Sequence, residues 1–166
     1  MNNQEQKELF PLDSLVINEN NDTVKLVDYI ELPCIIFFYP KDMTPGCTIE
    51  SCVFRDNYEE IIKLGFNVYG ISGDSQKSHA NFKKRFNLNY PLLTDANKEL
   101  QEKLGVVSTK KIFGKTVKGT IRSTFLVDKN GNIMAKWGDI PNSLGGVNVA
   151  THAQDIISYI KSNYKN

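Results

Sequence analysis

Blocks of apolar residues alternate with amphipathic stretches along most of the chain. The block from Cys34 to Pro40 is rich in Ile, Phe and Tyr and too short for a helix, so it predicts a strand buried on both faces. The block from Phe66 to Ser72 predicts a second buried strand. Between them a helical stretch begins at Thr44-Pro45 and stops at Gly65. Strand, helix and strand in this order predict a βαβ unit with parallel strands.

The same alternation continues through the middle of the chain. Asp74 to Asn87 is predicted as a helix, with Phe82 and Phe86 four residues apart on one side. Leu92 to Thr94 then predicts a short strand, and Lys98 to Leu104 predicts a short helix. These elements extend the parallel sheet by one more strand and cover it with two more helices.

Two antiparallel hairpins are predicted on either side of this core. Leu15 to Ile17 and Thr23 to Leu26 flank a polar loop, which is typical of a small hairpin. Ile121 to Asp128 and Asn132 to Trp137 flank an Asn-Gly pair, which is typical of a tight hairpin turn.

The remaining stretches complete the architecture. Leu26 to Tyr29 predicts the start of a short helix, and Gly105 to Thr120, rich in Gly and Lys with little periodicity, predicts a loop and candidate flap. Val149 to Tyr159 predicts a closing amphipathic helix whose buried stripe is Ile156, Ile157 and Ile160. Parallel βαβ units followed by a hairpin and a terminal helix predict a thioredoxin-like α/β fold, with a central mixed sheet flanked by helices and a single domain over residues 1–166.

Length and charge narrow the function classes. A chain of 166 residues can bury the core of one domain. Its 20 basic and 19 acidic residues leave a net charge of +1, so no nucleic-acid or membrane partner is expected. The first ten residues are polar and predict no secretory signal, and no apolar run approaches the roughly 20 residues of a membrane span. Three cysteines, an odd number, do not predict a secreted disulfide framework but favour redox-active thiols in a reducing cytoplasm.

The start of the first long helix places a cysteine in a reactive position. Thr44 is predicted as the N-cap and Pro45 as the first helical residue, so Cys47 lies in the first turn. Unpaired backbone N–H groups and the positive end of the helix dipole favour an anion there. A thiol at such a site has a lowered pKa, and Cys47 is therefore the candidate nucleophile.

A second cysteine follows five residues later on the same helix. On an intact helix Cys52 is rotated by about 140° from Cys47 and displaced by about 7.5 Å along the axis. Their Cα atoms would be roughly 8–9 Å apart, beyond the limit of about 7 Å for a disulfide. Cys47 falls on the apolar stripe and Cys52 on the polar side of the helix. The two cysteines can therefore bond only if the first turns of the helix unwind.

These residues resemble the active-site motif of a known family. Pro40-x-x-x-Thr44-x-x-Cys47 is similar to the pattern of peroxiredoxins, the thiol peroxidases, and the cysteine five residues on is similar to the bacterioferritin comigratory protein (PrxQ) subfamily. The resemblance extends through the segments TPGCTIESCVFRD, Gly70-Ile71-Ser72 and GTIRSTFLVDKNGNI. The chain departs from the family near its start, where Phe10-Pro11-Leu12 stands in place of an Ala-Pro-Asp-Phe-like segment.

The resemblance implies a reaction and a role for each cysteine. Cys47 would attack hydrogen peroxide or an organic hydroperoxide, forming a sulfenic acid and releasing water or an alcohol. Cys52 would resolve the sulfenic acid as an intramolecular disulfide, which thioredoxin or a similar dithiol protein would reduce. The Thr44 hydroxyl and the Cys47 backbone N–H would donate hydrogen bonds to the peroxide, and Pro40 would shield the sulfur from water.

Two charged residues complete the implied site. Arg122 matches the family's distal arginine within Gly-Thr-x-Arg-x-Thr-Phe-Leu, although its apolar strand alone favours an edge salt bridge. The guanidinium would hold the thiolate and the peroxide oxygens together. Glu50 resembles the carboxylate that orients this arginine, and a helix-surface charge is its alternative.

The other candidate groups have simpler explanations. Cys34 lies within the apolar strand and is expected to be buried and inert. His79 and His152 lack ligand spacing with Cys47 or Cys52, so no metal site is expected. No phosphate-binding glycine motif or haem-attachment motif is present, and the chemistry is expected to need no cofactor.

Two other function classes stay open. The same disulfide would also serve a redox-sensing or chaperone-like protein, and a copper or zinc carrier on this fold is a third class that lacks a suitable histidine. Arg122 with Thr44 discriminates best, because a sensor or carrier needs the thiols but no donors aimed at an oxygen. We expect a monomer or a weak homodimer.

Overall fold

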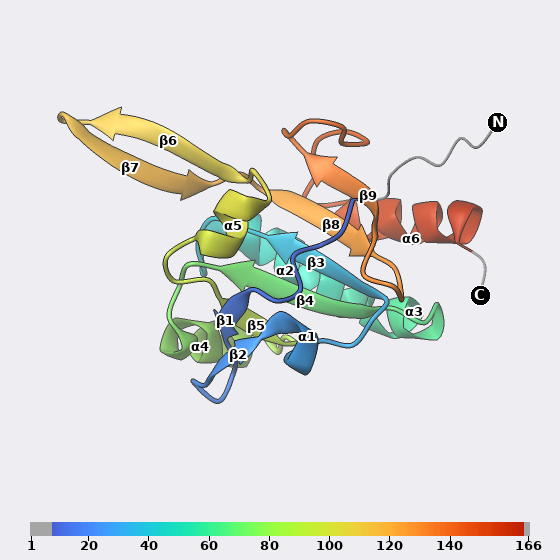
Figure 1. Cartoon of the computed structure of the whole chain (residues 1–166). Helices are drawn as coiled ribbons and strands as arrows, with labels where there is room; N and C mark the ends of the chain where they lie inside the picture. The colour runs from blue at the N-terminus through green and yellow to red at the C-terminus, as the bar shows by residue number, and fades with distance from the viewer. Residues whose placement is uncertain (1–7, 165–166) are drawn as a thin grey trace.

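The computed structural model describes residues 8–164. Its main sheet contains β1 (Leu15–Ile17), β2 (Thr23–Lys25), β3 (Cys34–Phe38), β4 (Asn67–Ser72), β5 (Leu92–Thr94), β8 (Ser123–Val127) and β9 (Ile133–Gly138). The helices are α1 (Leu26–Tyr29), α2 (Pro45–Asp56), α3 (Tyr58–Lys63), α4 (Gln76–Phe86), α5 (Glu99–Lys103) and α6 (His152–Asn163). Within the described residues this sheet is seven-stranded, in the order β2-β1-β5-β4-β3-β8-β9 (Figure 1).

The centre of the sheet confirms the predicted parallel core. β3 pairs in parallel with β4, and β4 pairs in parallel with β5. β8 runs antiparallel on the other side of β3, so the sheet is mixed, as predicted. All five residues of β3 are buried, because helices cover both faces of the sheet. The first hairpin, β1–β2, adds itself to the edge of the same sheet beside β5.

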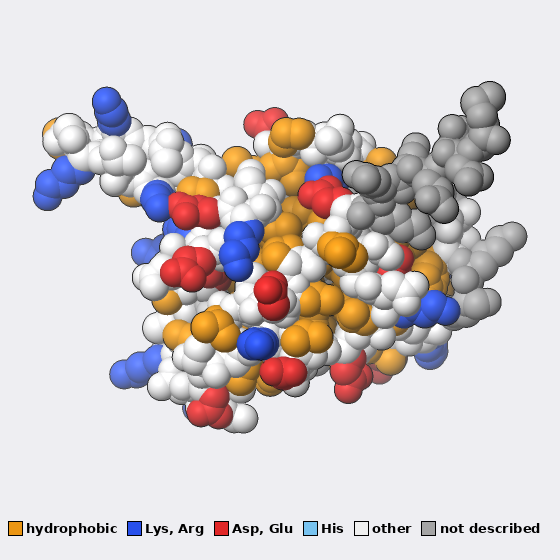
Figure 2. All heavy atoms as spheres, viewed as in Figure 1, with side chains coloured by type: hydrophobic (Ala, Val, Ile, Leu, Met, Phe, Trp, Pro, Cys, Tyr) orange, Lys and Arg blue, Asp and Glu red, His pale blue; other side chains and the backbone are white. Residues whose placement is uncertain are grey.

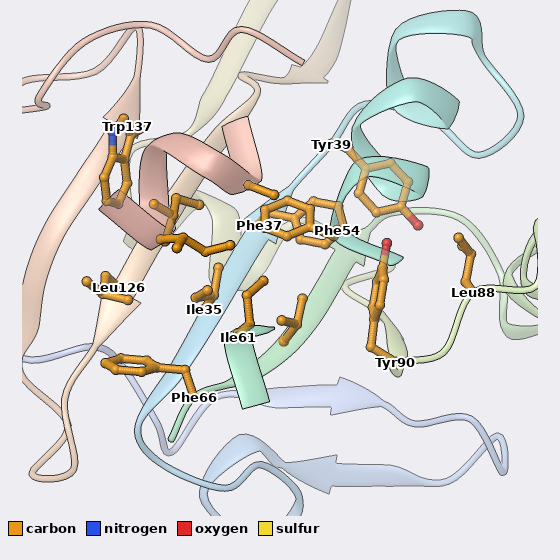
Figure 3. Packing of buried hydrophobic residues seen from close by; sticks show 14 of the residues in the cluster. Ile35, Phe37, Tyr39, Phe54, Ile61, Phe66, Leu88, Tyr90, Leu126 and Trp137 are labelled. Carbon is orange, nitrogen blue, oxygen red and sulfur yellow. The ribbon is translucent and has the colours of Figure 1, made fainter. Parts of the chain in front are cut away.

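Alternate side chains of β3 enter two separate cores. Ile35 and Phe37, together with Tyr39 just beyond the strand, pack on the side of α2, α3, α4 and α6. On this side Phe37 stacks on Phe54 of α2, with ring centroids 4.5 Å apart (Figure 3). Cys34, Ile36 and Phe38 pack on the opposite side, which α1 and α5 cover. The first core therefore holds α2, and the end of β3 delivers the chain to the start of that helix.

The helical stretch after β3 is two helices and not the single helix expected up to Gly65. α2 ends at Asp56 and α3 begins at Tyr58. At the junction Asn57 leaves helical geometry, with φ −104° and ψ 6°. Its side-chain amide donates to the Val53 carbonyl at 2.7 Å, a local bond that competes with the helical pattern. The break lies beyond both Cys47 and Cys52, which stay on α2.

The predicted loop between Gly105 and Thr120 is wrong. The segment forms a two-stranded antiparallel ribbon, β6 (Val107–Ile112) and β7 (Lys115–Thr120), that projects from the body of the molecule (Figure 1). Its turn, Phe113-Gly114, has φ values of +51° and +78°, as a two-residue hairpin turn requires. The ribbon is mostly exposed on both faces, with lysines along its outer half (Figure 2). It therefore lacks the apolar alternation by which a half-buried strand is predicted.

Two predicted boundaries also shift near the end of the chain. β8 begins at Ser123 and not at Ile121, so Arg122 lies just before the strand. The closing helix spans His152–Asn163 and not Val149 to Tyr159, because Asn148 begins a turn in which its carbonyl accepts from the Thr151 N–H at 3.1 Å. The predicted stripe of Ile156, Ile157 and Ile160 is buried.

Two sequence expectations concern the chain's environment. The sequence predicts no secretory signal in the first ten residues, of which 1–7 lie outside the described part of the structure. Across residues 8–164, no helix combines the length and the apolar character needed to cross a membrane.

Candidate active site

Cys47 lies in the first turn of α2, where the sequence placed it. The helix begins at Pro45 with Thr44 as its N-cap, so the Cys47 N–H has no partner within the helix. The Cys47 side chain is 1% exposed and belongs to the core cluster that includes Phe54 and Trp137. Its sulfur is thus kept from bulk water by the packed core beneath α2.

Arg122 connects Cys47 to a buried carboxylate. Its Nη2 donates to Cys47 Sγ at 3.2 Å, and its Nη1 donates to Glu50 Oε1 at 2.6 Å. A Cβ on Gly46 would lie 3.2 Å from this Nη2, so the glycine leaves room for the guanidinium beside the first turn of the helix. The sequence prediction that Cys47, Glu50 and Arg122 come together agrees with this geometry.

Glu50 is a buried acid whose charge depends on its arginine. Its side chain is 0% exposed, and burial raises its pKa to about 7 even though Arg122 acts in the opposite direction. Glu50 Oε2 is buried without a hydrogen-bond partner among the described residues. The surface-charge alternative for Glu50 is therefore wrong.

Arg122 stays a cation in this setting. Burial alone would lower its pKa, but the charge of Glu50 and the hydrogen bond to Cys47 outweigh burial, and the pKa of Arg122 is raised. The Arg122 guanidinium is planar and permanently charged, and it contacts the Cys47 sulfur and the Glu50 carboxylate at once. It can therefore bind one further anionic or polar oxygen in a fixed position.

The Thr44 side chain does not make the hydrogen bond to the helix backbone that is expected of an N-cap. Its hydroxyl does not cap α2 but donates to the Lys41 carbonyl at 2.8 Å. Because a hydroxyl has one proton, Thr44 in this state can accept a hydrogen bond from a bound molecule but has no proton left to donate. Pro40 is exposed, two residues after the end of β3. The shielding of Cys47 by Pro40 stays a prediction, and the core cluster covers the sulfur from the other side.

The other two cysteines differ sharply in environment. Cys52 is partly buried on α2, and burial raises its pKa, with Arg55 opposing and Asp56 adding to the shift. Cys34 is fully buried on the opposite face of the sheet from Cys47, and burial raises its pKa far above the ordinary value. All three cysteines are free in the described structure. Since α2 is unbroken from Pro45 to Asp56, Cys47 and Cys52 are held apart on one intact helix.

Sequence reasoning missed a buried cluster next to the site. Asp42, midway between Pro40 and Thr44, accepts a hydrogen bond from Tyr39 at 2.6 Å and pairs with His79 at 2.8 Å. Asp42 lies at an unspecified position of the recognised motif, and His79 is 37 residues away, so no local pattern could join them.

The second histidine is part of the core. His152 lies edge-on to Phe54 and to Trp137, with ring centroids 5.8 Å away in both cases. Burial lowers the pKa of His152 to about 4, so the ring is neutral at pH 7. Across residues 8–164, no three His, Cys, Asp or Glu side chains come together in an arrangement that could hold a metal ion.

Replacing Glu50 by Gln should remove a pH dependence of stability. Because burial raises the pKa of Glu50 from 4.5 to about 7, the folded protein holds this proton more tightly than the unfolded chain. The free energy of unfolding should therefore fall as the pH rises through this window, by on the order of 3 kcal/mol in the wild type relative to Glu50→Gln.

Urea unfolding of the two proteins at about pH 5 and about pH 8 measures this difference. If the free energies of unfolding of wild type and Glu50→Gln differ by the same amount at both pH values, the raised pKa of Glu50 is contradicted.

Comparison with known proteins places this geometry in a family. Residues 7–136 match the model of the AhpC/TSA family. Peroxiredoxin Bcp of Bacillus subtilis is 46% identical over 119 residues, which are 72% of this chain and 76% of that protein. Peroxiredoxin Bcp of Escherichia coli is 37% identical over 126 residues, or 76% of this chain and 81% of that protein.

Solved structures agree with the sequence comparison. Peroxiredoxin Q of Xanthomonas campestris superposes with a TM-score of 0.82 at 33% identity, covering 96% of this chain and 98% of that one. A structure of the bacterioferritin comigratory protein of the same organism, described in connection with its alkyl peroxide reduction activity, has a TM-score of 0.82 at 32% identity and covers 96% and 99%. The thioredoxin-like fold predicted from the sequence is confirmed. The chain therefore belongs to the AhpC/TSA family, within its Bcp/PrxQ peroxiredoxins, and is a thiol peroxidase.

Proposed function

We propose that Cys47 is the residue that reduces the peroxide. The observation that carries this assignment is the fork of Arg122, which contacts Cys47 Sγ and Glu50 together. The Cys47 thiolate attacks one peroxide oxygen, an S–O bond forms and the O–O bond breaks. The leaving oxygen takes up a proton and departs as water or, from an organic hydroperoxide, as an alcohol. Cys47 becomes a sulfenic acid.

The charges around Cys47 suit the transition state of this reaction. Negative charge moves from sulfur onto two oxygens, so fixed donors near all three atoms accelerate the step. Arg122 commits one N–H to sulfur and one to Glu50, and its remaining N–H groups can reach a peroxide oxygen. The Cys47 N–H at the start of α2 is a second donor. The Thr44 hydroxyl can accept a hydrogen bond from the O–H of the peroxide.

We assign the resolving role to Cys52. Its sulfur attacks the sulfur of the Cys47 sulfenic acid, an S–S bond forms, the S–O bond breaks, and water leaves. The intact α2 keeps the two cysteines apart, so its first turns must unwind before this step. Cys52 is only partly buried on α2, so its own side chain adds little core packing that would hold the helix folded. Cys34 takes no part, since it is buried on the other side of the sheet.

The family implies a peroxide substrate and a thiol reductant. We propose that the reductant is thioredoxin or a similar dithiol protein, because an intramolecular disulfide is reduced by exchange with two thiols of one partner. The alkyl peroxide reduction activity of the Xanthomonas campestris protein supports organic hydroperoxides beside hydrogen peroxide as substrates. The three free cysteines support a location in a reducing compartment such as the cytoplasm. A sensor would need the two thiols but not the Arg122–Glu50 pair.

The three cysteines should give three different phenotypes when replaced by serine. Cys47→Ser should abolish peroxide consumption, because no thiolate is left at the N-terminus of α2. Cys52→Ser should react once and then stall as a sulfenic acid or mixed disulfide, until a small thiol restores turnover. Cys34→Ser, the matched control, should keep nearly wild-type turnover.

The assay is peroxide consumption by the purified protein with thioredoxin, thioredoxin reductase and NADPH. Turnover by Cys47→Ser would rule out the assignment of the nucleophile, and steady turnover by Cys52→Ser without an added thiol would rule out the resolving role.

Arg122→Lys tests the fork. Lysine keeps the positive charge but cannot contact Cys47 and Glu50 in one plane, so the rate of the first peroxide reaction should fall by about 10²-fold or more. Stopped-flow oxidation under single-turnover conditions measures this step without the reductant. An Arg122→Lys protein as fast as wild type would show that the charge alone is needed.

A further inference from the structure

The loop that carries Pro40 and Thr44 is held by one buried carboxylate at its midpoint. Asp42 stands two residues from each of them, and its side chain is 2% exposed. Its two oxygens accept three hydrogen bonds, from Tyr39 Oη at 2.6 Å, Ser78 Oγ at 2.8 Å and His79 Nδ1 at 2.8 Å. A buried carboxylate is stable only when it is paired and hydrogen-bonded in this way.

His79 is hydrogen-bonded at both ring nitrogens. Nδ1 lies 2.8 Å from Asp42 Oδ2, and Nε2 lies 3.1 Å from the Leu93 carbonyl oxygen. The carbonyl can only accept, so Nε2 carries a proton, and one more proton lies between Nδ1 and the Asp42 carboxyl group. Asp42 and His79 therefore form a buried hydrogen-bonded pair, with both side chains only 2% exposed. This pair joins the loop to the first turns of α4 and to β5.

The backbone of Asp42 provides a second attachment. Its N–H donates to Asp74 Oδ2 at 2.8 Å, and the Ser72 hydroxyl donates to the same oxygen at 2.7 Å. Ser72 is the last residue of β4, in the centre of the sheet. The loop is thus tied through its side chain to α4 and through its backbone to β4, while its neighbours Lys41 and Met43 are exposed.

We propose that the Asp42–His79 pair is a latch that positions the peroxide-binding loop and limits the unwinding of α2. While it is closed, the loop between β3 and α2 is held at Asp42, two residues from Pro40 and two from Thr44. Only Met43 and Thr44 separate Asp42 from Pro45, so a fixed Asp42 restrains the start of α2. Asp42 and His79 are positioning residues, since neither contacts Cys47. The proposal rests on the resolving role of Cys52.

The latch decides between two fates of the sulfenic acid. If α2 unwinds, Cys52 attacks, the disulfide forms and water leaves. If α2 stays folded, a second hydroperoxide transfers an oxygen to the Cys47 sulfur, giving a sulfinic acid and one more water or alcohol. A tight latch speeds the first peroxide reaction by fixing the loop, but it delays Cys52. A weakened latch should therefore slow the first step and favour the disulfide.

Asp42→Asn is the sharpest test, because the amide keeps the shape of the side chain and removes its charge. The matched control is Asp95→Asn, at another buried carboxylate, 3% exposed, whose oxygens accept from the N–H groups of Leu100 and Gln101 at the start of α5. Wild type and both variants are oxidised with hydrogen peroxide at increasing concentration. The rate of the first step is followed through Trp137, which shares a core cluster with Cys47, and intact mass gives the ratio of sulfinic acid to disulfide.

For Asp42→Asn we expect the first step to slow by about tenfold, as for a misplaced binding group. The ratio of sulfinic acid to disulfide should fall severalfold, and Asp95→Asn should leave both measurements near wild type. If Asp42→Asn does not fold, Tyr39→Phe and Ser78→Ala each remove one bond to Asp42 and should shift the ratio in the same direction by less.

Two results would overturn the latch. One is a wild-type ratio in Asp42→Asn, Tyr39→Phe and Ser78→Ala. The other is an equal shift in Asp95→Asn, which would mean that general destabilisation unwinds α2. A wild-type protein that forms no intramolecular disulfide would instead refute the resolving role of Cys52, and the latch with it, so the two proposals fail in distinguishable ways.

Discussion

The active site depends on one guanidinium that is held between a sulfur and a buried carboxylate. Arg122 contacts Cys47 at 3.2 Å and Glu50 at 2.6 Å, and both partners lie on the first turns of α2. The fold serves this contact: β3 delivers the chain to α2, and the core beneath the helix removes water from the sulfur. Only a planar, permanently charged group can satisfy both partners and still offer N–H groups to a peroxide.

The same burial that prepares the site also favours the unwinding that completes the proposed cycle. Glu50 is fully buried and its pKa is raised to about 7, so folding α2 over it has a free-energy cost at neutral pH. The Asp42–His79 pair acts in the opposite direction, because it fixes the loop before α2 in the folded state. The buried Glu50 therefore favours unwinding of α2, and the Asp42–His79 pair opposes it. We regard this balance as the physical basis of a helix that must be folded for one step and unwound for the next.

Much of this architecture was predictable from local patterns. The apolar run at Cys34 and the Thr44-Pro45 helix start were clear, because burial on two faces and helix initiation have local signatures. Arg122 and Glu50 were identified only through the family motif, since a charge near a strand is ordinarily an edge salt bridge and a charge on a helix is ordinarily a surface charge. The β6–β7 ribbon was missed because strands exposed on both faces lack alternation. The Asp42–His79 pair was missed because a contact across 37 residues leaves no local signal.

The central claim is that α2 is intact when Cys47 meets the peroxide and unwinds when Cys52 bonds to it. Amide hydrogen exchange across residues 47–54, compared between the reduced and the disulfide forms, tests this most directly. We expect strong protection in the reduced protein, where α2 runs unbroken from Pro45. The disulfide form should lose that protection, because an intact helix would hold the two Cα atoms about 8–9 Å apart. Equal protection in both forms would contradict local unwinding and would indicate a disulfide between two molecules.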